Sequence, residues 1–364
     1  MTVAKADGRN FRALTKVKAK KVVKEGGFLI GVMGLAHGHI YGMIDGFADA
    51  GATVSCVYDP DPEKVYEFIS RVGDHVKVCA SADEMIDDPS IGLVINCVVP
   101  YERAQMSVRL LQAGKNVFSD KPGFLTVDGY RMIKEARDKS GKHYLIFFSE
   151  HFQCEGMIKA ISLVKDGAIG DVVHYEGFGP HRLNAPTRSL WFFDKRKNGS
   201  VLLDLGCHLV EQFLCLTKTK EASVVYASSV NLRHPQYPDF CDLGEMVLRT
   251  KEGATAYIRV DWFTPDGLSA WGDGRAFITG DKGYIEVRKY LDMGHGGPST
   301  GDRVYISDME TERMIDARDN VGFEFFGSFI LDCLNGTFDA TDYDLSLEAM
   351  RITVEAEQVA LRQS

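Results

Sequence analysis

The stretch Phe28-Leu-Ile-Gly-Val-Met33-Gly34-Leu-Ala36-His37-Gly38-His39 decides the fold. A short apolar run ends at Gly34 and a helical pattern follows the turn, which is the strand-turn-helix order of a dinucleotide-binding unit. The pattern G-x-G-x-x-G places Gly34, Ala36 and His39 at the three glycine positions, so only the tight-turn glycine is matched. Ala36 is small enough to let the backbone approach a pyrophosphate, whose charge would rest on the helix N-terminus.

Short apolar runs alternate with helical patterns up to residue 149. This alternation predicts an α/β fold, a doubly wound parallel sheet of the Rossmann type over residues 28–149. The expected strands cover 28–33, 53–58, 93–99, 116–118 and 144–148, and the expected helices cover 60–72, 101–113 and 127–139.

Strand-like runs lie closer together after residue 150. Hairpin-scale separations at 251–253 and 280–283 predict an α+β domain over 150–364, with a large, mainly antiparallel sheet. The expected strands cover 172–178, 222–231, 241–249, 255–263, 275–279 and 283–288, the expected helices cover 155–165 and 346–362, and 294–301 is expected to be a loop.

Composition narrows the class of protein. A chain of 364 residues with 45% hydrophobic and 26% charged residues suits two globular domains, and no stretch predicts a membrane span. A net charge of −9 argues against a nucleic-acid partner and favours small molecules. The eight cysteines form no C-x-x-C pair, which favours reduced thiols in the cytoplasm.

Residues 1–27 form a basic N-terminal arm, with eight lysines and arginines against Asp7 and Glu25. A solvated tail is the simplest interpretation, and an arm packed on a neighbouring subunit is the main alternative. A transit peptide has less support because the apolar spacing is irregular.

Asp59 closes the second expected strand, twenty residues after His39. A carboxylate there can bind the adenosine ribose diol and would repel the 2′-phosphate of NADP, so NAD is favoured over NADP. A turn residue before Pro60 is the bland alternative. His37 and His39 contact phosphate or substrate, or else are solvated or capping residues; a metal pair is less favoured.

Asp204 and His208 stand four residues apart. If the segment after Gly206 is helical, a carboxylate and an imidazole share one face at its first turn, as an acid/base pair requires. A helix cap at Asp204 and a core histidine at His208 are the structural alternative. A metal site from His174, His181, Asp204 and His208 lacks any short-spaced ligand motif.

Three motifs resemble the glucose-fructose oxidoreductase, inositol dehydrogenase and rhizopine-catabolism family (Gfo/Idh/MocA). The turn at Gly34 is one, Asp120-Lys121-Pro122 is similar to the family's Glu-Lys-Pro, and Asn198-Gly-Ser-Val-Leu-Leu-Asp204-Leu-Gly206-Cys-His208 is similar to its lead into Asp-x-Gly-x-His. The chain departs from the family at Asp120, at Ala36, at Pro100-Tyr101-Glu102 and at Phe148-Ser149-Glu150-His151. These departures indicate an atypical substrate pocket.

The resemblance implies an NAD-dependent oxidoreductase that moves a hydride between nicotinamide and a hydroxyl carbon of a sugar, cyclitol or glycoside, giving a keto sugar. His208 would be the base, Lys121 would stabilise the reacting oxygen, and Asp204 would orient His208 or bind a hydroxyl. The expected cofactor residues are Gly34, Ala36, His37, Gly38, His39, Asp59, Asn96, Val99, Pro100, Glu102, Asp120, Lys121 and Pro122. The expected substrate residues are Lys121, Glu150, His151, His181, Arg182, Trp191, Asp204 and His208, and no metal is expected.

The resemblance also implies a homo-oligomer formed through the sheet of the second domain. Two other functions stay open: glycoside cleavage through transient oxidation by tightly bound NAD, and nucleotide or sugar sensing without chemistry.

Overall fold

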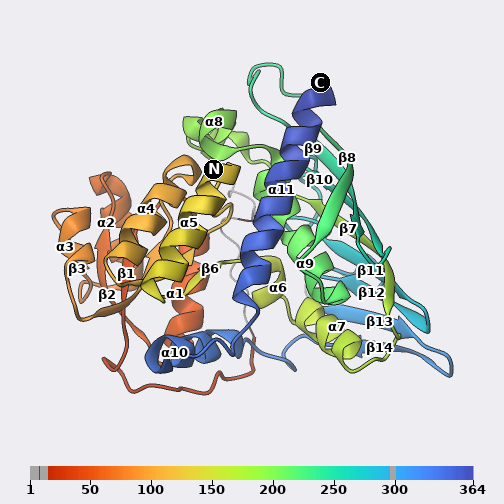
Figure 1. Ribbon diagram of the computed structural model, residues 1–364, viewed down its shortest axis with the longest axis horizontal. Coiled ribbons are helices and arrows are strands. Elements are labelled where there is room, and N and C mark those ends of the chain that lie inside the picture. The colour runs from red at the N-terminus through yellow and green to blue at the C-terminus, as the bar shows by residue number, and fades with distance from the viewer. Residues whose placement is uncertain (1–7, 9–14, 296–300, 364) are drawn as a thin grey trace. The chain divides into compact units, whose positions relative to one another are not determined.

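The computed structural model describes residue 8 and residues 15–295 and 301–363, which form two compact units (Figure 1). The parallel-sheet unit comprises Lys18–Phe147 and Phe323–Leu347, and the mixed-sheet unit comprises Met1–Val17, Phe148–Gly322 and Glu348–Ser364. The expected loop at 294–301 and the first part of the basic arm lie largely outside the described residues.

The parallel-sheet unit is the predicted doubly wound fold. Its six strands run in the order β3-β2-β1-β4-β5-β6, all parallel. The strands are β1 (Leu29–Met33), β2 (Thr53–Tyr58), β3 (Lys77–Val78), β4 (Ile91–Asn96), β5 (Asn116–Ser119) and β6 (Tyr144–Ile146), and the helices between them are α1 (His39–Asp49), α2 (Pro62–Val72), α3 (Ala82–Ile86), α4 (Pro100–Gln112) and α5 (Val127–Ser140). β1, β4, β5 and β6 are almost wholly buried, as expected for strands covered by helices on both faces.

The register of the central strands aligns their carboxyl ends. Met33 pairs with Tyr58 on one side and with Asn96 on the other, and Asn96 pairs with Ser119. The chain order reverses between β1 and β4, which is the switch point where open α/β sheets bind ligands. The segments that begin at Gly34, Asp59, Cys97 and Asp120 therefore leave the sheet at one edge.

Helix α10 (Phe325–Asn335) also packs on the parallel-sheet unit, although it lies far beyond residue 149 in the sequence. Its Phe326 ring lies 5.0 Å from that of Phe47, and a Cβ at Gly46 would fall 2.4 Å from the Phe326 ring, so the glycine allows this close approach. The long helix α11 (Tyr343–Gln363) begins in this unit and ends in the other.

The mixed-sheet unit contains the predicted large, mainly antiparallel sheet. Its strand order is β14-β13-β12-β11-β7-β10-β9-β8, and only β7 and β10 pair in parallel. The strands are β7 (Val172–Pro180), β8 (Ala222–Val230), β9 (Leu243–Thr250), β10 (Thr255–Asp261), β11 (Arg275–Gly280), β12 (Gly283–Arg288), β13 (Arg303–Ser307) and β14 (Glu312–Asp316), and the α-helices are α6 (Ser149–Phe152), α7 (Glu155–Lys165), α8 (Lys195–Asn198) and α9 (Cys207–Thr217). Sequence patterning missed β13 and β14; β14 buries none of its residues and so carries no apolar signal.

One helical run within the described residues, Lys195–Thr217, is long and apolar enough to cross a membrane by length and composition alone, with a mean hydropathy of 1.3. Its most apolar window is 89% buried inside the protein. This burial is that of a core helix.

The described part of the basic arm contacts folded protein. Thr15 donates to Glu155 in the mixed-sheet unit, and the Val22 amide donates to the Ala50 carbonyl in the parallel-sheet unit. These residues are therefore packed against the fold.

Candidate active site

Gly34 forms the tight turn that the nucleotide pattern requires. It has φ +83°, and a Cβ at this position would lie 2.6 Å from the backbone nitrogen of Val98, so another residue would strain the turn and clash. The Gly34 amide donates to Tyr58 O (2.7 Å) and the Ala36 amide donates to Cys97 O (3.0 Å). The turn is thus fixed to the strands on both sides of β1.

Helix α1 begins at His39 directly after this turn. Its N-cap, Gly38, has no side chain, and the His39 amide donates to His37 Nδ1 at 3.4 Å. A helix N-terminus of this kind favours an anion, and the small Ala36 leaves the backbone accessible. The turn therefore fits the pyrophosphate of a dinucleotide.

Asp59 is held beside the same turn. Its Oδ2 accepts from the Leu35 amide at 2.6 Å and its Oδ1 accepts from the Asp61 amide at 2.9 Å. Each carboxylate oxygen keeps a further lone pair. This carboxylate fits the ribose-binding role predicted for it.

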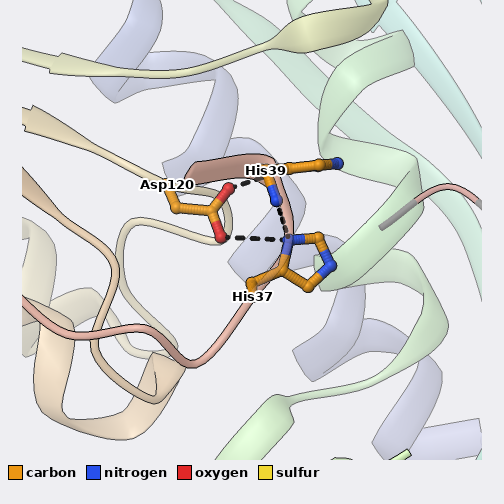
Figure 2. Close-up of side chains that lie close together, drawn as sticks. All are labelled: His37, His39 and Asp120. Atoms are coloured by element: carbon orange, nitrogen blue, oxygen red, sulfur yellow. Dashed lines mark hydrogen bonds and ion pairs between the residues drawn. The ribbon is translucent and has the colours of Figure 1, made fainter. Parts of the chain in front are cut away.

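Asp120 lies at the centre of a charged cluster with both loop histidines (Figure 2). It is fully buried; its Oδ1 lies 2.9 Å from His39 Nδ1 and its Oδ2 lies 3.4 Å from His37 Nδ1. Burial would raise the pKa of this carboxyl, but Arg103, His37 and His39 outweigh it and hold the pKa well below its usual value. Burial, followed by the charge of His39, lowers the pKa of His37 well below its usual value.

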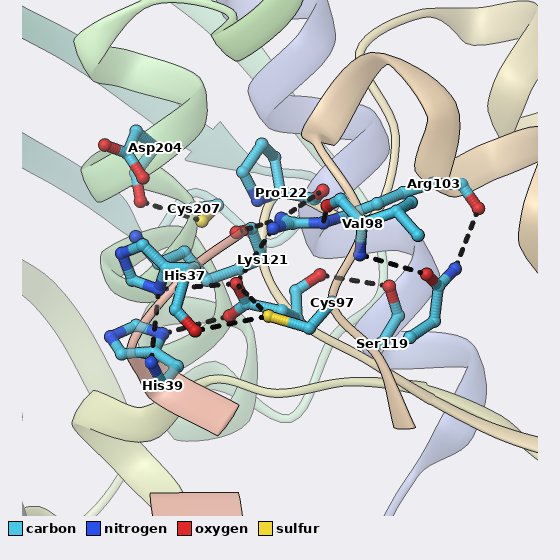
Figure 3. Close-up of polar contacts among 12 residues, drawn as sticks. His37, His39, Cys97, Val98, Arg103, Ser119, Lys121, Pro122, Asp204 and Cys207 are labelled. Carbon is cyan, nitrogen blue, oxygen red and sulfur yellow. Dashed lines mark hydrogen bonds and ion pairs between the residues drawn. The ribbon is translucent and has the colours of Figure 1, made fainter. Parts of the chain in front are cut away.

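Arg103, which the sequence did not single out, binds this cluster together (Figure 3). It is 1% exposed and donates to Asp120 Oδ2 (2.9 Å), Val98 O (2.8 Å), Pro122 O (3.2 Å) and Lys121 O. It therefore fixes the Asp120-Lys121-Pro122 segment, in which the Lys121–Pro122 peptide bond is cis. An arginine in an amphipathic helix is expected to lie on the surface, so the sequence did not predict the burial of Arg103.

The other expected cofactor residues follow β4. Asn96 is buried and donates from Nδ2 to Arg103 O and Ser107 Oγ, which ties the end of β4 to α4. Val99 is the N-cap of α4, Pro100 occupies its first turn, and exposed Glu102 accepts from the Tyr101 hydroxyl. Lys121 is 4% exposed.

Asp204 and His208 belong to the mixed-sheet unit. The segment after Gly206 is helical, as expected, but helical backbone already begins at Val201 and runs through a π-helical turn, Leu202–Gly206, into α9. Asp204 therefore lies in the π-turn and His208 in the first turn of α9. Asp204 is 5% and His208 1% exposed. π-Turns inside helices are frequent at functional sites, since they re-aim side chains.

Glu150 lies among three polar side chains: His181, directly after β7; Lys289, directly after β12; and Gln212 of α9. Its Oε2 is 2.8 Å from Lys289 Nζ and its Oε1 is 3.7 Å from His181 Nε2. Gln212, one turn after His208, donates to the Glu150 carbonyl at 3.3 Å. The structure thus groups Glu150 and His181 in one buried polar cluster.

The remaining expected substrate residues have varied surroundings. Arg182 donates to the carbonyls of Pro265, Leu268 and Ala270 and so shapes that loop. His151 Nδ1 lies 2.7 Å from Glu211 Oε1. Trp191 has a buried indole Nε1 without a hydrogen-bond partner among the described residues.

Two groups within the described residues bring possible metal ligands within 4.8 Å of one another: His37 with His39 and Asp120, and His151 with Glu211 and Cys215. In the first group the arginine on Asp120 would oppose a cation. In the second, Glu211 Oε1 already accepts from Cys215 at 3.2 Å. Both groups are accounted for by hydrogen bonds and ion pairs.

The parallel sheet, the glycine turn and Asp59 together define a dinucleotide-binding protein. Residues 28–148 match the family described as "Oxidoreductase family, NAD-binding Rossmann fold", and residues 157–286 match the GFO/IDH/MocA C-terminal domain. The chain belongs to the GFO/IDH/MocA family of oxidoreductases, as its motifs predicted, and NAD is the cofactor of its Rossmann domain.

Solved structures agree with this assignment. A candidate oxidoreductase from Erwinia carotovora atroseptica is 37% identical, with a TM-score of 0.88 over 92% of this chain and 98% of that one. Levoglucosan dehydrogenase, solved with NADH and levoglucosan, shares the fold at 17% identity, with a TM-score of 0.76 over 93% of this chain and 98% of that one.

Curated relatives include dehydrogenases of cyclitols and sugars. A scyllo-inositol 2-dehydrogenase (NAD(+)) of Bacillus subtilis is 22% identical over 65% of this chain and 66% of its own length. Matches to two uncharacterized oxidoreductases span 39% and 62% of the length of those relatives.

Proposed function

We propose that this protein is an NAD-dependent dehydrogenase that oxidises a secondary hydroxyl of a sugar, cyclitol or glycoside to a ketone. The observation that carries the proposal is the pairing, in one GFO/IDH/MocA chain, of a nucleotide turn beside Asp120-Lys121 with a buried His208. Both halves of the required chemistry are present as residues of the right type.

The cofactor would be held by the Gly34 turn, the N-terminus of α1 and Asp59. When bound, NAD supplies the acceptor for the hydride. Asp59 would accept hydrogen bonds from the ribose diol and repel a 2′-phosphate, which supports NAD over NADP. Arg103 would keep the Asp120-Lys121 segment in place while cofactor enters and leaves.

His208 is the proposed base and Lys121 the proposed electrostatic partner of the reacting oxygen. As the hydroxyl proton passes to the imidazole, negative charge grows on oxygen, and the oxygen lone pair would form the C=O bond as the hydride leaves the carbon for the nicotinamide. The Lys121 ammonium would stabilise that charge by a hydrogen bond in a partly dry site. Asp204, in the π-turn four residues before His208, would bind a neighbouring hydroxyl or orient the imidazole.

Substrate hydroxyls require donors and acceptors on the protein, and Trp191 offers an apolar ring together with a buried N–H. The face of the indole can stack on the apolar side of a sugar or cyclitol ring. The proposed substrate is therefore a polyhydroxylated ring that stacks on Trp191.

The test compares single-turnover NAD reduction by a panel of sugars, cyclitols and glycosides in the wild type and two variants. Lys121→Met and His208→Asn should each lower the rate of reduction by about 10²-fold or more, because general base and oxyanion groups contribute on that scale. Unchanged rates in either variant would remove that residue from the chemistry.

Assembly and location are part of the same proposal. The outer face of the mixed sheet presents an aromatic row, in which the Phe178 ring lies 6.3 Å from Tyr257 and 6.2 Å from Phe277. This face suits a homo-oligomer, which light scattering of the purified protein would reveal. All eight cysteines are free thiols, which supports the cytoplasm.

A further inference from the structure

A buried charge cluster adjoins the helix that carries His208. Glu150 is 2% and Lys289 1% exposed, and their charged atoms lie 2.8 Å apart. Removing two charges from water carries a desolvation cost that can exceed their attraction, so such a pair is weak evidence for stability alone. Its position suggests a use in the chemistry of the site.

Two contacts fix Glu150 relative to His208. Phe148, two residues before Glu150, packs edge to face with the His208 imidazole, with ring centroids 5.9 Å apart and planes at 79°. Gln212, one helical turn after His208, donates to the Glu150 carbonyl, and its Oε1 accepts from both Lys289 Nζ (3.1 Å) and Tyr175 OH (2.9 Å). These contacts tie the segment that carries Glu150 to α9, the helix that carries His208.

The charged and titratable groups that face Glu150 come from the mixed sheet and from α9. Lys289 and Tyr290 follow β12, Tyr175 and His181 belong to β7 and the residue after it, and His208 belongs to α9. Burial raises the pKa of both tyrosines well above their usual values, so they stay neutral. Burial would raise the pKa of Glu150 as well, but Lys289, His208 and His181 outweigh it and lower that pKa to about 2.

His181 faces this carboxylate through one ring nitrogen. Its Nδ1 lies 3.1 Å from the Gly179 carbonyl, which can only accept, so Nδ1 carries a proton. Its Nε2, 3.7 Å from Glu150 Oε1, then gains a proton only when the ring becomes a cation. The cluster therefore contains one cation, Lys289, and two imidazoles, and the negative charge of Glu150 favours the protonated form of each imidazole.

We propose that Glu150 is a positioning residue whose carboxylate, kept ionised by Lys289, stabilises the protonated form of His208. The inference rests on the proposed role of His208 as base. In that step the substrate O–H bond breaks, an N–H bond forms on the imidazole, and the electron pair stays on oxygen. A buried negative charge at a fixed position makes the imidazolium more stable and so makes the proton transfer more favourable.

The experiment follows the His208 imidazole by ¹³C NMR in the full-length protein without substrate, across a pH titration. The resonance is assigned from its loss in His208→Asn. Glu150→Gln should lower the pKa of His208 by about one unit or more, whereas Glu150→Asp should retain most of the wild-type value. The control is Glu211→Gln, which removes a buried carboxylate from the same helix and should leave the His208 pKa within a few tenths of a unit.

Glu150→Gln leaves Lys289 without its partner and can destabilise the fold for that reason. The double variant Glu150→Gln/Lys289→Met removes both charges and should still lower the His208 pKa, by less than the single variant does. An unchanged or raised pKa in the double variant, or in a folded single variant, overturns the proposal.

A kinetic arm separates this inference from the proposed function. The acid limb of the kcat profile should move to lower pH in Glu150→Gln, in step with the NMR value. A shifted NMR pKa with an unmoved acid limb would uphold the coupling of Glu150 to His208 and reject His208 as the base. An unshifted NMR pKa in an active enzyme would reject the coupling alone.

Discussion

Arg103→Met should destabilise the parallel-sheet unit far more than a surface substitution on the same helix. The guanidinium is 1% exposed, pairs with fully buried Asp120 at 2.9 Å, and donates to the carbonyls of Val98, Lys121 and Pro122. Methionine fills a similar volume but leaves the carboxylate and three carbonyls without these donors.

The expected cost follows from that inventory. Breaking a buried ion pair by removing one partner costs about 3–5 kcal/mol. Arg109→Met is the matched control on α4, because the Arg109 side chain is 48% exposed and pairs with exposed Asp83. Exposed pairs contribute about 0–1 kcal/mol, so the control should lose no more than about 1 kcal/mol.

Urea unfolding provides the assay. All three tryptophans, Trp191, Trp262 and Trp271, lie in the mixed-sheet unit, so tryptophan fluorescence reports the unfolding of that unit. Any change in far-UV CD that occurs without a change in fluorescence reports the unfolding of the parallel-sheet unit. A double-mutant cycle with Asp120→Asn should give a coupling of about 2 kcal/mol or more. A coupling below about 0.5 kcal/mol, or a loss for Arg103→Met equal to that of the control, would refute the role assigned to Arg103.

Three further predictions concern pH and cofactor choice. The pKa of His37 is lowered in the folded state, so the unfolded chain binds more protons below about pH 6.5 and Tm should fall as the pH is lowered from 7 to 5. This fall should be less steep in His37→Gln, and equal slopes in the wild type and the variant would contradict the prediction. Burial raises the pKa of Asp302 to about 6, so its ionisation lowers the stability of the fold as the pH rises from about 4 through 6. Asp302→Asn should therefore raise Tm at pH 8 and leave it unchanged at pH 4. Asp59→Ser should weaken NAD binding about tenfold, as loss of a charged hydrogen bond predicts, and improve NADP binding, both measured by calorimetry; unchanged NAD affinity would exclude the ribose role.

The sequence predicted both sheets because their strands are marked by apolar runs of the right length. The strands of the parallel sheet are buried on both faces, so they read as continuous apolar segments. β14 buries none of its residues and carried no such signal, and α10 gave no indication of the unit on which it packs. That information lies in contacts between residues far apart in the chain, such as Phe47 with Phe326.

Some residues of the candidate site could be predicted from the sequence and others could not. Gly34 and Asp59 were predicted as site residues because turns after parallel strands gather at one edge of a sheet, and Asp120 was predicted because its segment resembles a family motif. Arg103 and Lys289 were missed because a buried cation has the same sequence signature as a surface one. The π-turn at Leu202–Gly206 was missed as well, since hydrophobic spacing does not distinguish it from an ordinary helical turn.

The most direct test of the central claim is the absorbance of nicotinamide during single-turnover mixing of the protein and NAD with sugars, cyclitols and glycosides. We expect one polyol class to reduce NAD in the wild type, and His208→Asn to abolish most of that rate while still binding NAD. Confirmed NAD binding without reduction by any member of the panel would contradict the dehydrogenase assignment. Aglycone release without net reduction would then indicate transient oxidation, and silence in both measurements would indicate a sensing protein.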